Sequence, residues 1–250
     1  AGSIKLDETG TLASTIAMSG GTLDADNSLT VSGVLTQSGD VTIDVVTGKT
    51  LTYYSGTNVR IGANTLTVIG GGTLSNQNAI VLDNVDSKLL LNTVTVDSVS
   101  TSADSLGLDV DNNSTITSLS VANITPVAIA SGKTLSGGIT VSAGSIKLNE
   151  TGTLASTIAM SGGTLDADDS LVVSGALTQS GDITIDVADN KTLTYSGAAV
   201  EIGEYTLNVI GGGILNNNNA LVLSSGGSKL LLDSTTLNKA STSSGSLGLD

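Results

Sequence analysis

LTVSGVLTQSGDVTIDV, residues 29–45, shows the pattern that recurs along this chain and decides its fold. Apolar and polar residues alternate over very short runs, such as LTV and VTIDV, and these runs recur between segments that contain glycine, serine, asparagine or aspartate. Alternation with a period of two is typical of a β-strand with one buried face, and no stretch has the longer period of an amphipathic helix. The pattern therefore predicts a nearly all-β protein with strands of about three to five residues.

A much longer repeat contains this stretch, because residues 1–33 return almost unchanged as residues 143–175. The differences are Asp7/Asn149, Asn27/Asp169 and Thr30/Val172. We therefore divide the chain into a first β-solenoid copy at residues 1–142 and a truncated second copy at residues 143–250.

The two copies fall out of step at KTLTYYSG, residues 49–56, because the second copy reads KTLTYSG and lacks one tyrosine. A one-residue slip within a strand would turn every later side chain to the opposite face of the sheet. We therefore expect Tyr54 to lie at a corner or a bulge, where one extra residue is absorbed.

Three features favour a parallel β-helix, or β-solenoid, over a sandwich or a barrel. The strands are short, the hairpin dipeptides Asn-Gly and Asp-Gly are absent, and self-similarity at a fixed spacing is typical of stacked units. Coils of roughly 20–25 residues would place about six coils in each copy, with in-register parallel strands. The residues expected inside include Leu29, Val31, Ile43, Leu66 and Val68.

The recurring phrases GGTL, GKTL and SGxLT resemble those of bacterial secreted parallel β-helix proteins. This group includes autotransporter passenger domains, filamentous-haemagglutinin-like adhesins and large repetitive surface proteins. The resemblance implies the β-solenoid architecture and an extracellular or cell-surface location, and it brings no catalytic residue with it.

The composition excludes several classes of function. With 23 acidic and 9 basic residues the net charge is −14, which argues against nucleic acid and anionic membrane surfaces as partners. No apolar run is long enough to insert into a bilayer. The absence of cysteine and histidine excludes thiol catalysis, cysteine-bound zinc and the usual serine triad.

Calcium is the one cofactor that the sequence suggests. LDADNS at residues 23–28, LDADDS at 165–170 and the related LDVDNNS at 108–114 carry the D-x-D-x-S type of spacing that opens a calcium loop. The later glycine and the distal glutamate of that loop are missing, so the alternative of solvated, outward-facing carboxylates stays open. The candidate ligands are Asp24, Asp26, Ser28, Asp166, Asp168, Asp109 and Asp111.

Three other interpretations have weaker support. A polysaccharide-active enzyme would need a basic group for its substrate, yet the only arginine, Arg60, becomes Glu201 in the second copy, and we expect no enzymatic activity. Ice binding is disfavoured because threonine looks scattered among serine, lysine and aspartate rather than confined to one face. The asparagines of NNNN, residues 216–219, are expected to stack as amide ladders at a turn.

These observations leave two main functions open. The first is an extracellular structural protein, in which the chain is a rod- or fibre-forming segment. The second is an adhesin stalk that binds carbohydrate or a host surface, although few tyrosines are available for stacking on sugars. The chain starts and stops inside a repeat, so we expect more covalent repeats or subunits stacked end to end into a filament.

Overall fold

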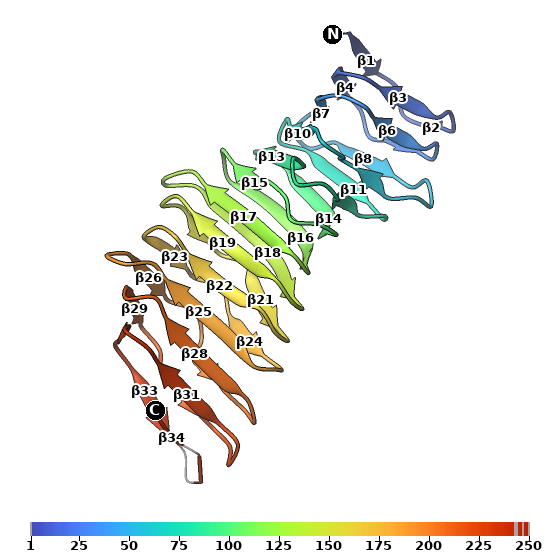
Figure 1. Ribbon diagram of the computed structural model, residues 1–250. Helices are drawn as coiled ribbons and strands as arrows, with labels where there is room; N and C mark the ends of the chain where they lie inside the picture. Colours follow the sequence, from blue (N-terminus) through green and yellow to red (C-terminus); the bar gives the residue numbers. More distant parts are fainter. Residues whose placement is uncertain (1, 243–244, 247, 250) are drawn as a thin grey trace. The chain divides into compact units, whose positions relative to one another are not determined.

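The chain folds into a parallel β-solenoid of about 12 turns with short strands, which confirms the predicted fold class. The computed structural model describes residues 2–242, 245–246 and 248–249, and within these ranges it contains β-strands and no helix. Contacts divide the chain into two compact units at residues 1–119 and 120–250, and Figure 1 shows the strands of each unit side by side. The unit boundary differs from the boundary of the sequence copies at residue 142.

In the first unit, each turn places up to three strands in succession. Strands of the first two series pair in parallel with those of the neighbouring turns, and strands of the third series pair with only some of theirs. The first series is β1 (Ser3–Leu6), β4 (Gly21–Ala25), β7 (Val41–Val45), β10 (Thr65–Ile69), β13 (Lys88–Asn92) and β15 (Gly107–Val110). The second is β2 (Thr11–Leu12), β5 (Leu29–Val31), β8 (Thr50–Tyr53), β11 (Thr73–Asn76), β14 (Thr95–Thr101) and β16 (Ser114–Val121). The third is β3 (Ile16–Met18), β6 (Leu35–Gln37), β9 (Val59–Arg60) and β12 (Ile80–Leu82).

The second unit repeats the three series. Its first series is β17 (Ile124–Ile129), β19 (Ser145–Asn149), β22 (Thr164–Ala167), β25 (Ile183–Val187), β28 (Thr206–Ile210), β31 (Lys229–Leu232) and β34 (Gly248–Leu249). The second is β18 (Thr134–Val141), β20 (Thr153–Leu154), β23 (Leu171–Val173), β26 (Thr192–Tyr195), β29 (Ile214–Asn217) and β32 (Thr236–Leu237). The third is β21 (Thr157–Met160), β24 (Leu177–Gln179), β27 (Val200–Glu201), β30 (Leu221–Leu223) and β33 (Ala240–Thr242).

The number of turns in one copy is larger than expected. Ile4 pairs with Leu23, Leu23 with Ile43 and Ile43 with Val68, so successive turns differ in length and the turn that starts at Ile4 is the shortest of these three. The first copy contains the first-series strands β1, β4, β7, β10, β13, β15 and β17, which makes seven turns rather than about six. The estimate was low because it took the longer turns as typical.

The interior consists of columns of aliphatic side chains, as predicted from the period of two. Leu29, Val31, Ile43, Leu66 and Val68 are all buried, with at most 7% of any of them exposed. In-register pairing places Leu29 over Leu51, and Ile43 and Leu66 over other aliphatic side chains, whereas Val31 lies over Tyr53. Each fully buried leucine, isoleucine or valine contributes about 1.5–3 kcal/mol, so the stacked columns stabilise the fold without any phenylalanine or tryptophan.

Some strands are longer than the three to five residues expected. β14 has 7 residues and β16 and β18 have 8 each. β14 is long because its first half pairs with β11 and its second half with β12, two strands that a corner separates in the preceding turn. The short alternating runs therefore predict where strands occur better than they predict how long the strands are.

The GGG corner at residues 70–72 shows why glycine is needed where turns pass close to one another. Gly70 and Gly71 have positive φ angles of 106° and 81°. A Cβ atom on Gly70 would lie 2.1 Å from the Asp44 carboxylate and 2.4 Å from the carbonyl oxygen of Val45. The second copy keeps this arrangement at Gly211, which approaches Asp186 at the same 2.1 Å.

The tyrosine insertion lies at a corner, as predicted. Tyr53 ends β8 with its side chain buried, and Tyr54 follows outside the strand with 56% of its surface exposed. The Tyr53 hydroxyl accepts a hydrogen bond from the backbone N–H of Leu35 at 3.0 Å, and Tyr195 accepts the same bond from Leu177 at 3.0 Å. Tyr195 is therefore the counterpart of Tyr53, and Tyr54 is the inserted residue.

This assignment predicts different effects for the two adjacent tyrosines. Tyr53→Phe should lower the free energy of unfolding by about 1–2 kcal/mol, because it leaves the buried N–H of Leu35 without its hydroxyl acceptor. Deletion of Tyr54 should change stability little, because the second copy already lacks this residue. Urea unfolding of both variants tests the assignment, and a larger loss from the deletion would contradict it.

Candidate functional site

The acidic motifs lie on the outer surface of the first series of strands. Asp24 is on β4 and Asp26 follows that strand, while the residues between and before them, Leu23 and Ala25, are buried. The alternation predicted for this motif is therefore present, and both carboxylates point away from the core.

A lysine from the preceding turn lies against each acidic motif. Lys5 pairs in register with Asp24, and its Nζ lies 2.7 Å from the carboxylate of Asp26. In the second copy the Nζ of Lys147 lies 3.1 Å from the carboxylates of both Asp166 and Asp168. These lysines could not be recognised from the sequence as partners, because each precedes its acidic motif by a whole turn of the solenoid.

The other candidate calcium ligands have different surroundings. The Oγ of Ser28 accepts the backbone N–H of Thr50 at 3.0 Å, and the Oγ of Ser170 accepts that of Thr192 at 3.0 Å. Lys88 forms an ion pair with Asp109. Asp111 is exposed beyond the end of β15. The serine hydroxyls thus connect neighbouring turns.

Calcium binding therefore stays a prediction. Within the part of the chain that the structure describes, no three acidic, histidine or cysteine side chains gather closely enough to hold a metal ion together. Melting curves recorded with and without EDTA decide the matter. A lower melting temperature with chelator would support calcium, because a ligand of the folded state stabilises that state, and an unchanged curve would leave the carboxylates as solvated charge.

Partial burial and neighbouring negative charges raise the pKa of one carboxyl group in each copy. Burial raises the pKa of Asp166, whose side chain is only 15% exposed, and the charges of Asp168 and Asp186 raise the pKa further. Asp186 lies directly over Asp166 in the next turn. In the first copy, burial and the charge of Asp26 likewise raise the pKa of Asp24. Both copies therefore keep a carboxylate whose charge is disfavoured in the folded protein.

The raised pKa of Asp166 predicts a particular dependence of stability on pH. A carboxyl with a higher pKa in the folded state keeps its proton to higher pH than in the unfolded chain, so its contribution to stability falls as pH rises through that interval. Asp166→Asn should therefore raise the melting temperature at neutral pH and weaken its dependence on mildly acidic pH. Thermal melting between acidic and neutral pH tests this, with Glu8→Gln, at an exposed carboxylate away from Asp166, as the control that should not raise it.

At one position where the charge of a residue differs between the copies, the residue that faces it in the next turn differs as well. The guanidinium of Arg60 lies 2.9 Å from the carboxylate of Asp83 in the next turn. In the second copy these positions hold Glu201 and Ser224, so two acidic residues do not stack there. Asp83 accepts the N–H of Gly62 at 2.8 Å and Ser224 that of Gly203 at 3.4 Å, so both residues stabilise the same kind of corner.

A surface hollow of about 220 Å³ lies beside Arg60 in the first unit. Its lining combines apolar and hydrogen-bonding groups, and consists of Val34, Leu35, Thr36, Gln37, Thr57, Asn58 and Arg60. Four of these residues differ in the second copy, where Val34 becomes Ala176 and the residues Thr57, Asn58 and Arg60 become Ala198, Ala199 and Glu201. The hollow therefore has a chemistry that only the first copy carries.

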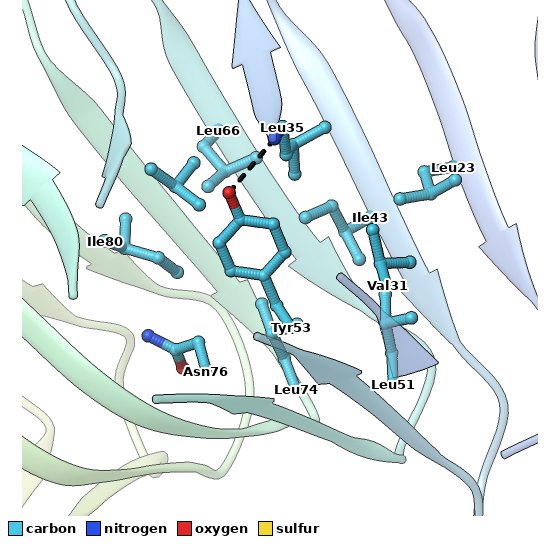
Figure 2. Close-up of a pocket in the computed structure, with 11 residues that line it drawn as sticks. Leu23, Val31, Leu35, Ile43, Leu51, Tyr53, Leu66, Leu74, Asn76 and Ile80 are labelled. Atoms are coloured by element: carbon cyan, nitrogen blue, oxygen red, sulfur yellow. Dashed lines mark hydrogen bonds between the residues drawn. The ribbon is translucent and has the colours of Figure 1, made fainter. Parts of the chain in front are cut away.

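The interior of the first unit offers little space. Figure 2 shows Tyr53 and Asn76 among aliphatic side chains such as Leu51, Leu66 and Ile80, around a cavity of about 10 Å³. A cavity of that size holds one water molecule at most. Any ligand of this region would therefore bind at the surface.

The expected amide ladder is present at the half-buried Asn216, whose Oδ1 accepts the side-chain amide of Asn238 in the next turn. The buried asparagines bond differently. The Asn76 amide donates to the carbonyl oxygen of Asn78 at 3.0 Å, and its Oδ1 accepts the N–H groups of Asp97 at 3.1 Å and Ser98 at 3.2 Å. In NNNN, Asn217 makes the corresponding bonds, to the carbonyl oxygen of Asn219 at 2.9 Å and from the N–H of Lys239 at 3.1 Å. The buried amides therefore bond to backbone, because the corner leaves backbone groups without ladder partners.

Threonine is not confined to one face of the first unit, since Thr22, Thr42 and Thr67 align on the first series of strands. Threonine and serine hydroxyls also form two adjacent columns on the second series, an alignment that the sequence does not show. On the second series of strands, Thr11 pairs in register with Thr30, Thr30 with Thr52, and Thr52 with Ser75. A parallel column is formed by Ser28, Thr50, Thr73 and Thr95. We call these two columns the hydroxyl face. Turns of unequal length hide this alignment in the sequence.

Comparison with known proteins gives no further assignment, since no family model, no curated protein and no solved structure matches the chain. In the described part of the chain there is also no helix with the length and apolar character to span a membrane.

Proposed function

We propose that this chain is a rod- or fibre-forming segment of a longer extracellular structural protein. The observation that supports the proposal best is the recurrence of the same interior contacts in both copies. Tyr53 and Tyr195 accept hydrogen bonds from equivalent backbone N–H groups of the two copies. Asn76 and Asn217 likewise bond to equivalent backbone atoms at a corner. A module whose inner contacts recur in this way is suited to propagation along one axis.

The surface chemistry is consistent with this function and with a location outside the cell. The net charge of −14 favours solubility, and the cavity inside the first unit has space for at most a water molecule. Propagation would occur through further covalent repeats or through subunits that stack end to end. We propose no catalytic role, because the function of such a segment lies in its reach and in its outer surface.

Chains that carry one, two and four copies of residues 1–142 test the proposal. Seven turns at about 4.8 Å each predict that every added copy lengthens the particle by about 34 Å. Small-angle scattering measures the maximum dimension and the cross-section of each chain. A linear increase in length at constant cross-section supports the rod, whereas compact particles that grow in all directions would overturn it.

An adhesin is the second candidate, and the hollow beside Arg60 favours it. A guanidinium, two side-chain amides and threonine hydroxyls lie around an apolar base formed by Val34 and Leu35. This combination suits the hydroxyl groups and the apolar face of a neutral sugar. The net charge of −14 disfavours polyanionic glycans.

The second copy supplies a matched variant for this candidate. The substitutions Val34→Ala, Thr57→Ala, Asn58→Ala, Arg60→Glu and Asp83→Ser convert the hollow to the residues of the second copy, which the same fold already accepts. A glycan array probed with both proteins tests the adhesin. Binding of neutral glycans that disappears in the variant supports it, and equal binding or none counts against it.

A further inference from the structure

The hydroxyl face is a regular two-dimensional array. Its columns run through successive turns of the first unit, with neighbouring hydroxyls about 4.8 Å apart across the strands. Along each strand the two columns are separated by two residues, about 6.6 Å. Within one strand the pairs are Thr50 with Thr52 and Thr73 with Ser75, and Ser28, directly before β5, pairs with Thr30 in the same way. The array therefore repeats a hydroxyl and a methyl group at fixed intervals in two directions.

The threonine hydroxyls of this face are available to bind something outside the protein. Among the described residues, the hydroxyls of Thr30, Thr50, Thr52 and Thr73 make no hydrogen bond within the chain, and the four residues are half-buried. The serines differ, since Ser28 accepts the N–H of Thr50 and Ser75 donates to Asp97 at 2.7 Å. Asp97 follows Ser75 in the same column, so a charged residue marks the end of the uncharged array.

The first series of strands shows that β-propensity alone does not explain the array. Threonine is favoured on any outward strand position, so propensity predicts similar faces on both series. The first series does carry Thr22, Thr42 and Thr67 in register. The adjacent column, however, begins with Lys5, Asp24 and Asp44. Of these two series, the second alone presents two neighbouring uncharged columns.

We propose that the hydroxyl face binds the surface of ice. An ice surface presents water oxygens in regular rows whose spacing is close to that of strands in a sheet, so aligned hydroxyls can complete its hydrogen bonds. Methyl groups between them order the intervening water, whereas charged groups hold their own hydration shells and would disrupt the match. A crystalline polysaccharide is a poorer occupant, because aromatic side chains for stacking on sugar rings are absent from both columns. This inference is independent of the proposed rod.

The second copy indicates where the activity resides. Its counterparts of Thr30, Thr73 and Ser75 are Val172, Ile214 and Asn216. Ile214 is 42% exposed, so an apolar side chain interrupts the columns at the surface. Ice binding is therefore assigned to the first unit.

Thermal hysteresis, the gap between the melting and freezing temperatures of a seed crystal, tests the proposal with the full chain. Thr52→Lys combined with Thr73→Lys should abolish the hysteresis by placing two charges on the hydroxyl face. The matched control, Thr22→Lys with Thr67→Lys, adds the same charge to the first series and should keep it. Melting temperatures of the two double variants show that both are folded. Loss confined to the first variant supports the proposal, and absent hysteresis in the unaltered protein or equal effects of both variants would overturn it.

Discussion

Replacing Gly175 by alanine is expected to destabilise the protein by about 3 kcal/mol or more. The new Cβ atom would lie 1.8 Å from the carbonyl oxygen of Ser156 in the preceding turn and 2.3 Å from its carbonyl carbon. Both are backbone atoms, so neither can rotate out of the way as the end of a flexible side chain could. The counterpart Gly33 would meet the carbonyl oxygen of Ser14 at 1.9 Å, and Gly33→Ala should have the same effect.

Urea unfolding measures this effect, and Ser174→Ala is the control. Ser174 is exposed next to Gly175, so its truncation should change the free energy of unfolding by less than about 0.5 kcal/mol. A Gly175→Ala protein as stable as the control would show that the two turns are not in close contact at this corner.

A second large effect is expected from Asn76→Leu. Asn76 is 1% exposed, and its side chain bonds to backbone N–H groups of Asp97 and Ser98 and to the carbonyl oxygen of Asn78. Leucine has a similar size but offers no hydrogen bond, so several buried backbone groups lose a partner at about 1–3 kcal/mol each. The total loss should be about 3 kcal/mol or more.

The exposed neighbour Gln77 provides the comparison for this prediction. Gln77→Leu should leave stability within about 0.5 kcal/mol of the unaltered protein. Asn217→Leu should reproduce the loss in the second copy, because Asn217 makes the corresponding bonds. Similar stabilities for Asn76→Leu and Gln77→Leu would contradict the assigned role of the buried amide.

The fold follows from the sequence because one-sided burial leaves a strong local signal. Leu29 and Val31 alternate with Thr30, and the same spacing recurs at Ile43, Leu66 and Val68, so strand type and interior residues were predictable. The extra tyrosine was equally informative, because only a corner absorbs one residue without changing the face of later side chains. These inferences need no knowledge of which turn lies next to which.

The sequence does not reveal the register, that is, which residues of successive turns lie next to one another. Thr30, Thr52 and Ser75 form one column although the sequence steps between them are unequal, and other turns of the first unit are shorter or longer still. Unequal corners therefore hid the hydroxyl face, the seventh turn of the first copy and the lysines beside the acidic motifs. The role of Asn76 was hidden for the same reason, since its partners Asp97 and Ser98 belong to the following turn.

In-register stacking of the turns is the central claim, and disulfide cross-linking tests it most directly. The chain contains no cysteine, so introduced pairs are unambiguous. Thr42 and Thr67 are register partners on neighbouring strands, about 4.8 Å apart, which is within the range that a disulfide spans. Thr42→Cys with Thr67→Cys should therefore oxidise rapidly to an intramolecular disulfide, whereas Thr42→Cys with Thr65→Cys, displaced by two residues along the strand, should not. Equal or reversed cross-linking of the two pairs would contradict the account.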